Sequence, residues 1–387
     1  MRSVLFVSAH ELRTRWQWWV SLALLVAFAG GCVLTAAAGA RRTGSAYQRF
    51  LVASKASDVL VSPAGTGLRG YYAALARLPS AAVAAPVVGL NVLPTGPGGR
   101  LVLSAVAAAP LDRRWGHVLE IPKVLAGRLP LPARPGEIAV DQNGARALHL
   151  HVGSTLAMRA LRAGASPGTN AAHGRPMRER VVGVIVTRGS VRPVTNLDKV
   201  PFVLASTALV RRLGPGYIGF DGAYVKLRPG YSPGTAGRRA EALAQHFPAT
   251  RGHVFVADED AQAAAVERSI RPEAISLALF ALILAVTTLL IVGQAAVRQL
   301  AAAAVGHHTL AALGMTRAQL TAAGLVEVGT AGAVGAVAAV AAAVAASPLM
   351  PIGLARLAEP DPGFSVAGMV LATGAVAIVV LLLAWTA

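Results

Sequence analysis

One uncharged stretch decides the fold class of this chain: Ile275-Ser276-Leu277-Ala278-Leu279-Phe280-Ala281-Leu282-Ile283-Leu284. The stretch lies in a window, residues 274–297, that contains no Asp, Glu, Lys or Arg. A helix needs about 20 predominantly apolar residues to cross a hydrocarbon core of about 30 Å. This window therefore predicts a helix that spans a membrane.

Three more windows lack the same four residue types and are long enough to span. They cover residues 16–40, 328–355 and 362–387. The first opens with Trp16-Gln17-Trp18-Trp19, which is typical of an aromatic belt at a membrane interface. The third spanning helix is expected to begin near Leu320 and to end before Pro348, which places Glu327 inside it.

The composition agrees with a membrane protein that also has a large part in water. Of the 387 residues 55% are apolar and 14% are charged, and the mean hydropathy is +0.56, values outside the usual range of a soluble enzyme. The formal net charge of +18 is too large for spanning helices alone to carry. The single cysteine, Cys32, excludes an internal disulfide and a thiolate metal cluster.

Most of this charge lies between the first two spanning helices. Residues 41–273 hold 30 basic and 14 acidic residues, and their short β-branched runs are punctuated by Gly and Pro, as in strands. Strands are predicted over 58–63, 101–106, 181–186 and 223–227, and helices over 71–78, 142–148 and 237–246. We therefore predict an α+β domain. The Gly/Pro/Ser-rich stretch 163–176 either divides it into two lobes or forms a hairpin tip.

The arginines near the helix ends set the orientation. Arg2, Arg13 and Arg15 precede the first span, whereas only Arg356 lies between the third and fourth, which favours a cytoplasmic N-terminus in the cytoplasmic (inner) membrane. The predicted order is a cytoplasmic segment 1–16, transmembrane helix 17–40, extracytoplasmic domain 41–273, transmembrane helix 274–297, cytoplasmic loop 298–319, transmembrane helix 320–346, external loop 347–365 and transmembrane helix 366–387.

A lipoprotein-type signal is the rival interpretation of the first span, because Ala29-Gly30-Gly31-Cys32 vaguely resembles a cleavage box. The apolar run continues past Cys32, so its length favours an uncleaved anchor. Near the second span, Pro272 either breaks the helix that leaves the outer domain or lies within it, and the sequence leaves both open.

The search for catalytic and ligand-binding motifs excludes several classes of function. There is no Gly-x-x-x-x-Gly-Lys-Ser/Thr loop for a nucleoside triphosphate, and no Gly-x-Ser-x-Gly elbow. His10-Glu11-Leu12-Arg13-Thr14 lacks the second His of a zinc motif, and His149 with His151 on a strand lacks a third ligand. The basic residues form no run of five and alternate with no aromatic residues, which argues against nucleic-acid binding. We expect no enzyme activity, metal or cofactor in this chain.

The functional signal lies in the loop after the second span. It reads His308-Thr309-Leu310-Ala311-Ala312-Leu313-Gly314-Met315-Thr316-Arg317-Ala318-Gln319-Leu320. Gly314 is a C-cap signal and Thr316 an N-cap signal. They predict a short helix over residues 309–313, joined by a tight bend to the third span. An ordinary interfacial loop is the alternative.

This segment resembles the "L-x-A-L-G-M-T-R-x-Q-L" segment of the FtsX/MacB-like permeases of ABC transporters. Residues 124–130, 136–140 and 151–154 are similar to that family's "G-R-x-P … E-x-x-V … V-G-D" stretch, with Ser154 in place of the usual acid. The resemblance implies four transmembrane helices and an extracytoplasmic α+β domain of MacB-like periplasmic core type. It also implies a separate ABC-type ATPase that holds ATP-Mg, and a second permease chain as homodimer partner or homologous half.

The resemblance further assigns ATPase coupling to Leu310, Leu313, Gly314, Met315, Thr316 and Arg317. Two positions depart from the family, since Ala311 replaces a basic residue and His308 an acid. Family members also continue beyond the equivalent of Ala387, so one half of a larger permease and a truncated product both stay open.

The third span carries an acid among small residues, Glu327 with Gly324, Gly332 and Gly335. Such a face suits close helix packing. An acid in a membrane is either paired or functional, or it extends to the interface, here toward Arg317 or Arg298. The resulting hypothesis is a permease subunit that couples ATP hydrolysis on its partner to movement of the outer domain, for export, lipid or lipoprotein extraction or mechanotransmission. The alternative is a membrane-anchored sensor or scaffold whose outer domain binds a ligand.

Overall fold

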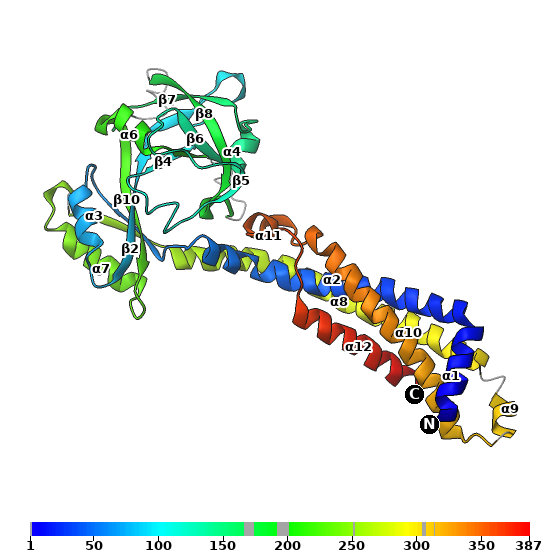
Figure 1. The fold of residues 1–387 in the computed structure, drawn as a ribbon. Coiled ribbons are helices and arrows are strands. Elements are labelled where there is room, and N and C mark those ends of the chain that lie inside the picture. The colour runs from blue at the N-terminus through cyan, green and yellow to red at the C-terminus, as the bar shows by residue number, and fades with distance from the viewer. Residues whose placement is uncertain (1, 166–173, 192–200, 251, 304–306, 313) are drawn as a thin grey trace. The chain divides into compact units, whose positions relative to one another are not determined.

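The computed structural model describes residues 2–165, 174–191, 201–250, 252–303, 307–312 and 314–387. The chain divides into two compact units (Figure 1). Met1–Ala46 and Ile270–Ala387 form a helical unit, and Tyr47–Ser269 form an outer unit built on a sheet. Each unit is described by itself below.

Among the described residues, four helices are long and apolar enough to cross a membrane: Trp16–Ala53, Glu259–Ala303, Arg317–Leu349 and Gly368–Thr386. The helical unit comprises α1 (Arg2–Thr14), most of α2 (Trp16–Ala53) and of α8 (Glu259–Ala303), α9 (His307–Ala312), α10 (Arg317–Ala346), α11 (Gly353–Ala358) and α12 (Gly368–Thr386), with a 3-10 turn at Ser347–Leu349. The chain is therefore a four-span membrane protein with an additional mixed α/β domain.

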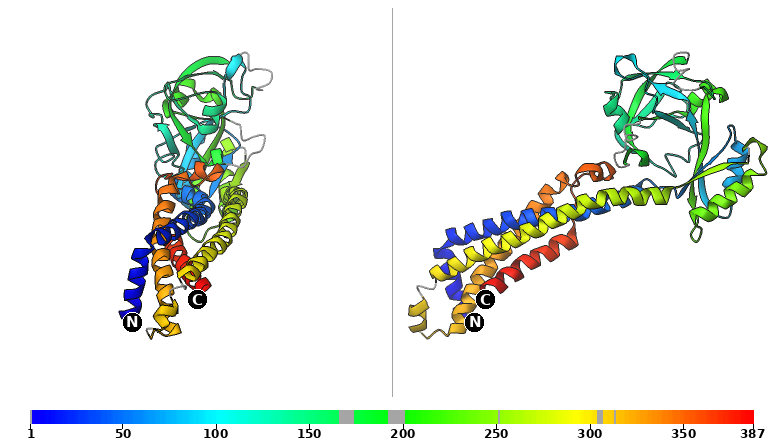
Figure 2. Two further views of the ribbon diagram at one scale, coloured as in Figure 1. Left: turned by 90° about the vertical axis from the view of Figure 1, so that its right-hand side faces the viewer. Right: turned by 180° about the vertical axis from the view of Figure 1, so that it is seen from behind.

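The spanning helices bury one side and expose the other. Leu22 and Val26 of α2 are each 1% exposed and pack with Val292 of α8 and Val328 of α10, whereas Phe28 is 75% exposed. Figure 2 shows α2, α8, α10 and α12 running side by side. Because large apolar side chains cover the outer surface, this bundle is suited to lipid rather than water.

Glycine brings α2 and α10 into close contact. A Cβ at Gly335 of α10 would lie 2.6 Å from the Cβ of Val26 and 2.8 Å from the carbonyl oxygen of Ala23. On the facing helix, a Cβ at Gly31 would lie 3.2 Å from that of Ala342. Small residues on both helices are the usual means of close packing in membranes.

The outer unit is organised around an eleven-stranded mixed sheet. Its path is β11-β1-β10-β2-β4-β9-β6-β8-β7-β3, with β5 paired to β8. The strands are β1 (Val59–Pro63), β2 (Ala81–Leu90), β3 (Val92–Pro94), β4 (Val106–Pro110), β5 (Lys123–Gly127), β6 (Glu137–Asp141), β7 (Thr155–Ala160), β8 (Arg175–Val186), β9 (Phe202–Ala205), β10 (Ile218–Leu227) and β11 (Val254–Asp258). Only the β4–β9 and β6–β8 pairs are parallel among the described strands.

Two hydrophobic cores share the long strands β2 and β10. Helices α3 (Arg69–Leu75) and α7 (Pro233–Ala244) cover one core around Tyr71 and Val225. Helices α4 (Gln142–Ala147) and α6 (Thr207–Leu213) belong to the other, around Ile138 and Leu209. Strands β7 and β8 pair from Thr155–Arg180 to Ala160–Arg175. The predicted stretch 163–176 therefore connects two paired antiparallel strands, and its residues 166–173 lie outside the described residues.

The predicted strand over residues 101–106 is wrong. Leu101 forms only an isolated bridge to Thr95, across a turn in which Gly98 and Gly99 have φ values of 74° and 78°, and Leu103 is 53% exposed. Regular strand β4 begins only at Val106. The sequence had also given no sign of β2, whose Ala-rich run lacks the usual β-branched pattern.

The spanning helices extend beyond their predicted bounds. Helix α2 continues past residue 40 to Ala53, and α10 begins at Arg317 rather than near Leu320. Helix α8 runs from Glu259 to Ala303 with Pro272 inside it. Of the two alternatives at this proline, the one in which it lies within the helix is therefore found.

Candidate functional site

The loop between α8 and α10 contains a short helix with a defined end. The Met315 N–H donates to the Leu310 carbonyl at 3.1 Å, and the Gly314 N–H to the Ala311 carbonyl at 3.0 Å. Gly314 has a φ of 95°, a conformation that favours glycine. These two hydrogen bonds form a Schellman motif, so the C-cap predicted at Gly314 is present.

The next helix begins with an equally defined cap. Thr316 accepts a hydrogen bond on its Oγ1 from the Gln319 N–H at 3.3 Å, and its own N–H donates to Gln319 Oε1 at 3.0 Å. This reciprocal pair is a capping box. The bend between α9 and α10 is therefore fixed by backbone geometry at both of its ends.

The predicted coupling residues differ in their surroundings. Leu310 is half-buried and lines a cavity within the helical unit, and Met315 is also half-buried. Gly314, Thr316 and Arg317 are exposed, while Leu313 lies outside the described residues. On α9, the exposed side chains among those described belong to Ala311 and Ala312.

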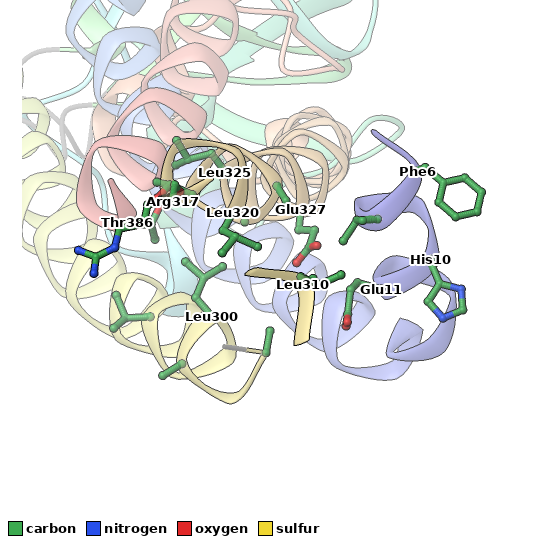
Figure 3. Close-up of a pocket in the computed structure, with 17 residues that line it drawn as sticks. Phe6, His10, Glu11, Leu300, Leu310, Arg317, Leu320, Leu325, Glu327 and Thr386 are labelled. Carbon is green, nitrogen blue, oxygen red and sulfur yellow. Dashed lines mark hydrogen bonds between the residues drawn. The ribbon is translucent and has the colours of Figure 1, made fainter. Parts of the chain in front are cut away.

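The cavity beside Leu310 has a volume of about 850 Å³. It is bordered by α1, α8, α9, α10 and the end of α12, with Leu300, Leu310 and Leu320 among its apolar lining residues. Two carboxylates, those of Glu11 and Glu327, also line it. Figure 3 shows the Glu327 carboxylate directed toward the side of α1 that carries Glu11.

Glu327 is buried, at 4% exposure. Neither Arg317 nor Arg298 forms an ion pair with it in the described part of the chain, so the predicted interfacial pairing is absent. Around it, a Cβ at Gly324 would lie 2.8 Å from Leu300 of α8, and one at Gly332 would lie 3.1 Å from Leu382 of α12. These glycines thus lie at contacts between α10 and its neighbours.

Sequence reasoning missed the contribution of α1. Residues 1–16 were expected only as a cytoplasmic segment, but Arg2–Thr14 form a helix that packs on α10. Ser8, 1% exposed, donates its hydroxyl to the Ala323 carbonyl at 3.2 Å. The available signal was the helical spacing of Val4, Ser8 and Glu11, which places them on one face.

A second polar cluster lies inside the outer unit, where Arg188 is 9% exposed. Its Nη1 lies 3.0 Å from Glu259 Oε2 and 3.5 Å from Glu120 Oε1, and both glutamates are buried. Glu259 is the first residue of α8. Glu120 also accepts hydrogen bonds from the backbone N–H and the hydroxyl of Ser57, each at 2.8 Å.

The backbone at Glu120 and Ile121 forms hydrogen bonds to the residues that follow α2. The Ile121 N–H donates to the Ser54 carbonyl at 2.7 Å, and the Glu120 N–H to the Lys55 carbonyl at 3.3 Å. Arg188 and Glu120 therefore connect the residues directly after α2 to the first residue of α8. Sequence reasoning missed this cluster, which depends on contacts between residues far apart in the chain.

The Gly-Arg-x-Pro stretch of the outer unit also has a structural partner. Arg128 forms two hydrogen bonds of 2.7 Å to Glu137 on β6, and Arg134 a third of 3.1 Å. With the Leu131 N–H at 3.1 Å, these donors lower the pKa of Glu137 to about 2, the Arg128 hydrogen bond contributing most. These hydrogen bonds attach the Gly-Arg-x-Pro stretch to strand β6 of the sheet.

The histidine pair does not form the strand site that was considered. His149 has a φ of 52° and lies in a turn, and the His151 ring lies 3.1 Å from Ser154 Oγ. Among the described residues no group of three His, Cys, Asp or Glu side chains is arranged to hold a metal.

Comparison with solved structures finds similarity to about half of this chain. The chain is 15% identical to the periplasmic region of MacB from Actinobacillus actinomycetemcomitans, covering 53% of this chain and 90% of that one with a TM-score of 0.35. The chain is similar to MacB-type outer domains. For the extracellular domain of the ABC-type transporter YknZ of Gram-positive bacteria, the identity is 10%, the coverage 51% and 98%, and the TM-score 0.34.

A domain of a permease protein from Porphyromonas gingivalis is similar at 12% identity, covering 52% of this chain and 88% of that one, with a TM-score of 0.30. No protein-family model matches the sequence, and no curated protein matches it.

Proposed function

We propose that this chain is the permease subunit of an ABC transporter and couples ATP hydrolysis on a separate ATPase subunit to movement of its extracytoplasmic domain. One observation carries the proposal: α9 lies between two spanning helices, and its bend into α10 is fixed by the Schellman motif at Gly314 and the capping box at Thr316. Because the bend is fixed, a force or rotation applied to α9 moves α10 and does not merely bend the connection between them.

The proposed contact with the ATPase is the segment from Leu310 to Arg317, which includes Leu313, Gly314, Met315 and Thr316. Ala311 and Ala312 give α9 a flat exposed side that can approach a groove closely. Arg317 supplies a planar donor for a carboxylate at the rim. Since Ala311 replaces the family's basic residue, apolar contact is expected to dominate.

Transmission to the outer unit is proposed to use α8. This helix runs without interruption from Glu259 to Ala303, and its first residue pairs with the buried Arg188. A rigid helix with one end anchored by a buried ion pair can carry displacement into the sheet domain. A second permease chain, as a homodimer partner or a homologous half, and the inner-membrane orientation with a cytoplasmic N-terminus complete the proposal.

A membrane-anchored sensor or scaffold is the second candidate. It is favoured by the exposed alanines of α9, which would also suit a helix lying free in the interface. The two candidates differ in whether an ATPase binds the α9 segment.

The test is a charge on the exposed side of α9. Ala311→Glu changes a side chain that is exposed in the isolated chain, so folding should persist, whereas a carboxylate forced into a groove should release the ATPase. Coexpression with an ABC-type ATP-binding subunit from the same genome, followed by copurification and ATP hydrolysis, gives the readout. Ala302→Glu, at an exposed position near the end of α8, is the matched control. Wild-type copurification and hydrolysis in Ala311→Glu would contradict the α9 contact, and absence of copurification with the wild-type chain would support the sensor.

A further inference from the structure

The cavity beside α9 contains a carboxylate that lacks a partner. Glu327 is 4% exposed and lines the cavity, and no hydrogen bond or ion pair from the described residues reaches its carboxylate. Its carboxylate is directed toward the α1 wall of the cavity (Figure 3). A buried charge without compensation is costly, and buried charges in proteins are normally paired. Among the described residues this carboxylate thus has no direct partner.

The other charged groups at the cavity do not meet this need. Arg15, which follows α1, lies 3.5 Å from Glu11 and acts on Glu327 electrostatically without forming an ion pair with it. Arg317 and His10 also border the cavity. In Figure 3 the side chains of Arg317 and His10 lie on opposite flanks of the cavity, away from the Glu327 carboxylate. The region around Glu327 and Glu11 thus has an acidic character within an apolar wall.

The rest of the lining is suited to a hydrophobic molecule. Leu300, Leu310 and Leu320 come from three different helices, and the volume of about 850 Å³ falls in the range of small-molecule sites, roughly 300 to 1,000 Å³. Such sites combine a mostly apolar surface with a few placed polar groups. Here the placed polar group is an acid.

We propose that this cavity binds a hydrophobic organic cation, such as an amphiphilic amine or a quaternary ammonium or phosphonium compound. The cationic centre pairs with Glu327, with Glu11 close by, and the apolar body packs on Leu300 and Leu320. The site does not depend on the proposed coupling to an ATPase, because its ligand contacts only this chain.

The test measures binding of tetraphenylphosphonium to the full chain in nanodiscs by equilibrium dialysis, with empty nanodiscs as the partition background. Tetraphenylborate, of similar size and opposite charge, is the probe control. We expect saturable binding of one phosphonium per chain and no saturable binding of the borate. Glu327→Gln removes the charge that pairs with the cation, so phosphonium binding should weaken by at least about tenfold.

Two variants separate the site from general effects. Glu273→Gln removes another carboxylate of the helical unit, whose Oε2 is buried and has no hydrogen-bond partner, but Glu273 does not line the cavity; binding should be unchanged. Leu320→Trp fills the cavity and leaves both carboxylates in place, so binding should again weaken. Equal binding to wild type and Glu327→Gln, or equal binding of both probes, would overturn the proposal. Copurification of the ATPase should be the same in Glu327→Gln and wild type. A failure of the ATPase to copurify with either chain would contradict the proposed function and would leave the ligand site untouched.

Discussion

Replacing Arg188 with Met removes the guanidinium that joins Glu120 to Glu259. The arginine is 9% exposed, and its Nη1 lies 3.0 Å from one carboxylate and 3.5 Å from the other. Met keeps most of the apolar stem but supplies no charge, so two buried glutamates lose their shared cation. Glu120 retains its two hydrogen bonds from Ser57.

The expected loss of stability follows from breaking a buried pair on one side only. Such changes cost about 3 to 5 kcal/mol, and the remaining Ser57 bonds favour the lower end, about 3 kcal/mol. Each 1.4 kcal/mol corresponds to about a factor of ten, so amide protection in β11 and at the start of α8 should fall by about 100-fold.

Hydrogen exchange on the full chain in detergent, read by mass spectrometry, measures this change. Arg134→Met is the matched control, because Arg134 is 65% exposed on its side chain although it also pairs with a glutamate; exposed pairs contribute about 0 to 1 kcal/mol. Protection in Arg188→Met within about threefold of wild type would refute the view that this buried arginine anchors α8.

The remaining predictions address packing, charge and topology. Gly335→Leu should lower the thermal unfolding temperature of the purified chain, because its Cβ would meet Val26 at 2.6 Å and overpacking costs about 1 to 3 kcal/mol; an unchanged temperature would contradict the close α2–α10 contact. Glu137→Gln should destabilise the outer unit at pH 7. Because the folded pKa of about 2 lies below the ordinary 4.5, this carboxylate stabilises the fold above pH 4.5 and loses that effect as the pH falls toward 2, so the melting curves of variant and wild type should converge there. A cysteine at the exposed position Val152, in a Cys32→Ala background, should react with an impermeant thiol reagent in intact cells, and labelling only after lysis would reverse the orientation.

The parts of the molecule that could be predicted from sequence are those set by local chemistry. Uncharged windows identified the spanning helices because hydrocarbon length imposes a minimum run. Gly314 and Thr316 identified the bend because each residue type satisfies a specific orphan backbone group at a helix end. Residues 101–106 were misassigned because Leu101 forms only an isolated bridge across the turn at Gly98 and Gly99, and the regular strand begins at Val106.

The features that could not be predicted depend on contacts between distant segments. Glu120, Arg188 and Glu259 meet only when the sheet has formed, and nothing in their immediate neighbours marks them. Likewise, Glu11 and Glu327 border one cavity only because α1 packs on α10. Leu310 lines the same cavity, and helical spacing alone could not predict which neighbour its side chain would contact.

The central claim, that ATP hydrolysis on a partner moves the outer unit, is tested most directly by a distance between the two units. Spin labels at Val118, 45% exposed in the outer unit, and at Leu349, 69% exposed in the helical unit, would be introduced in a Cys32→Ala background and followed with the ATPase in nanodiscs. The account predicts that the distance distribution shifts when ATP and vanadate are added, and that Ala311→Glu abolishes the shift. An unchanged distribution while the ATPase is bound and hydrolysing ATP would contradict it.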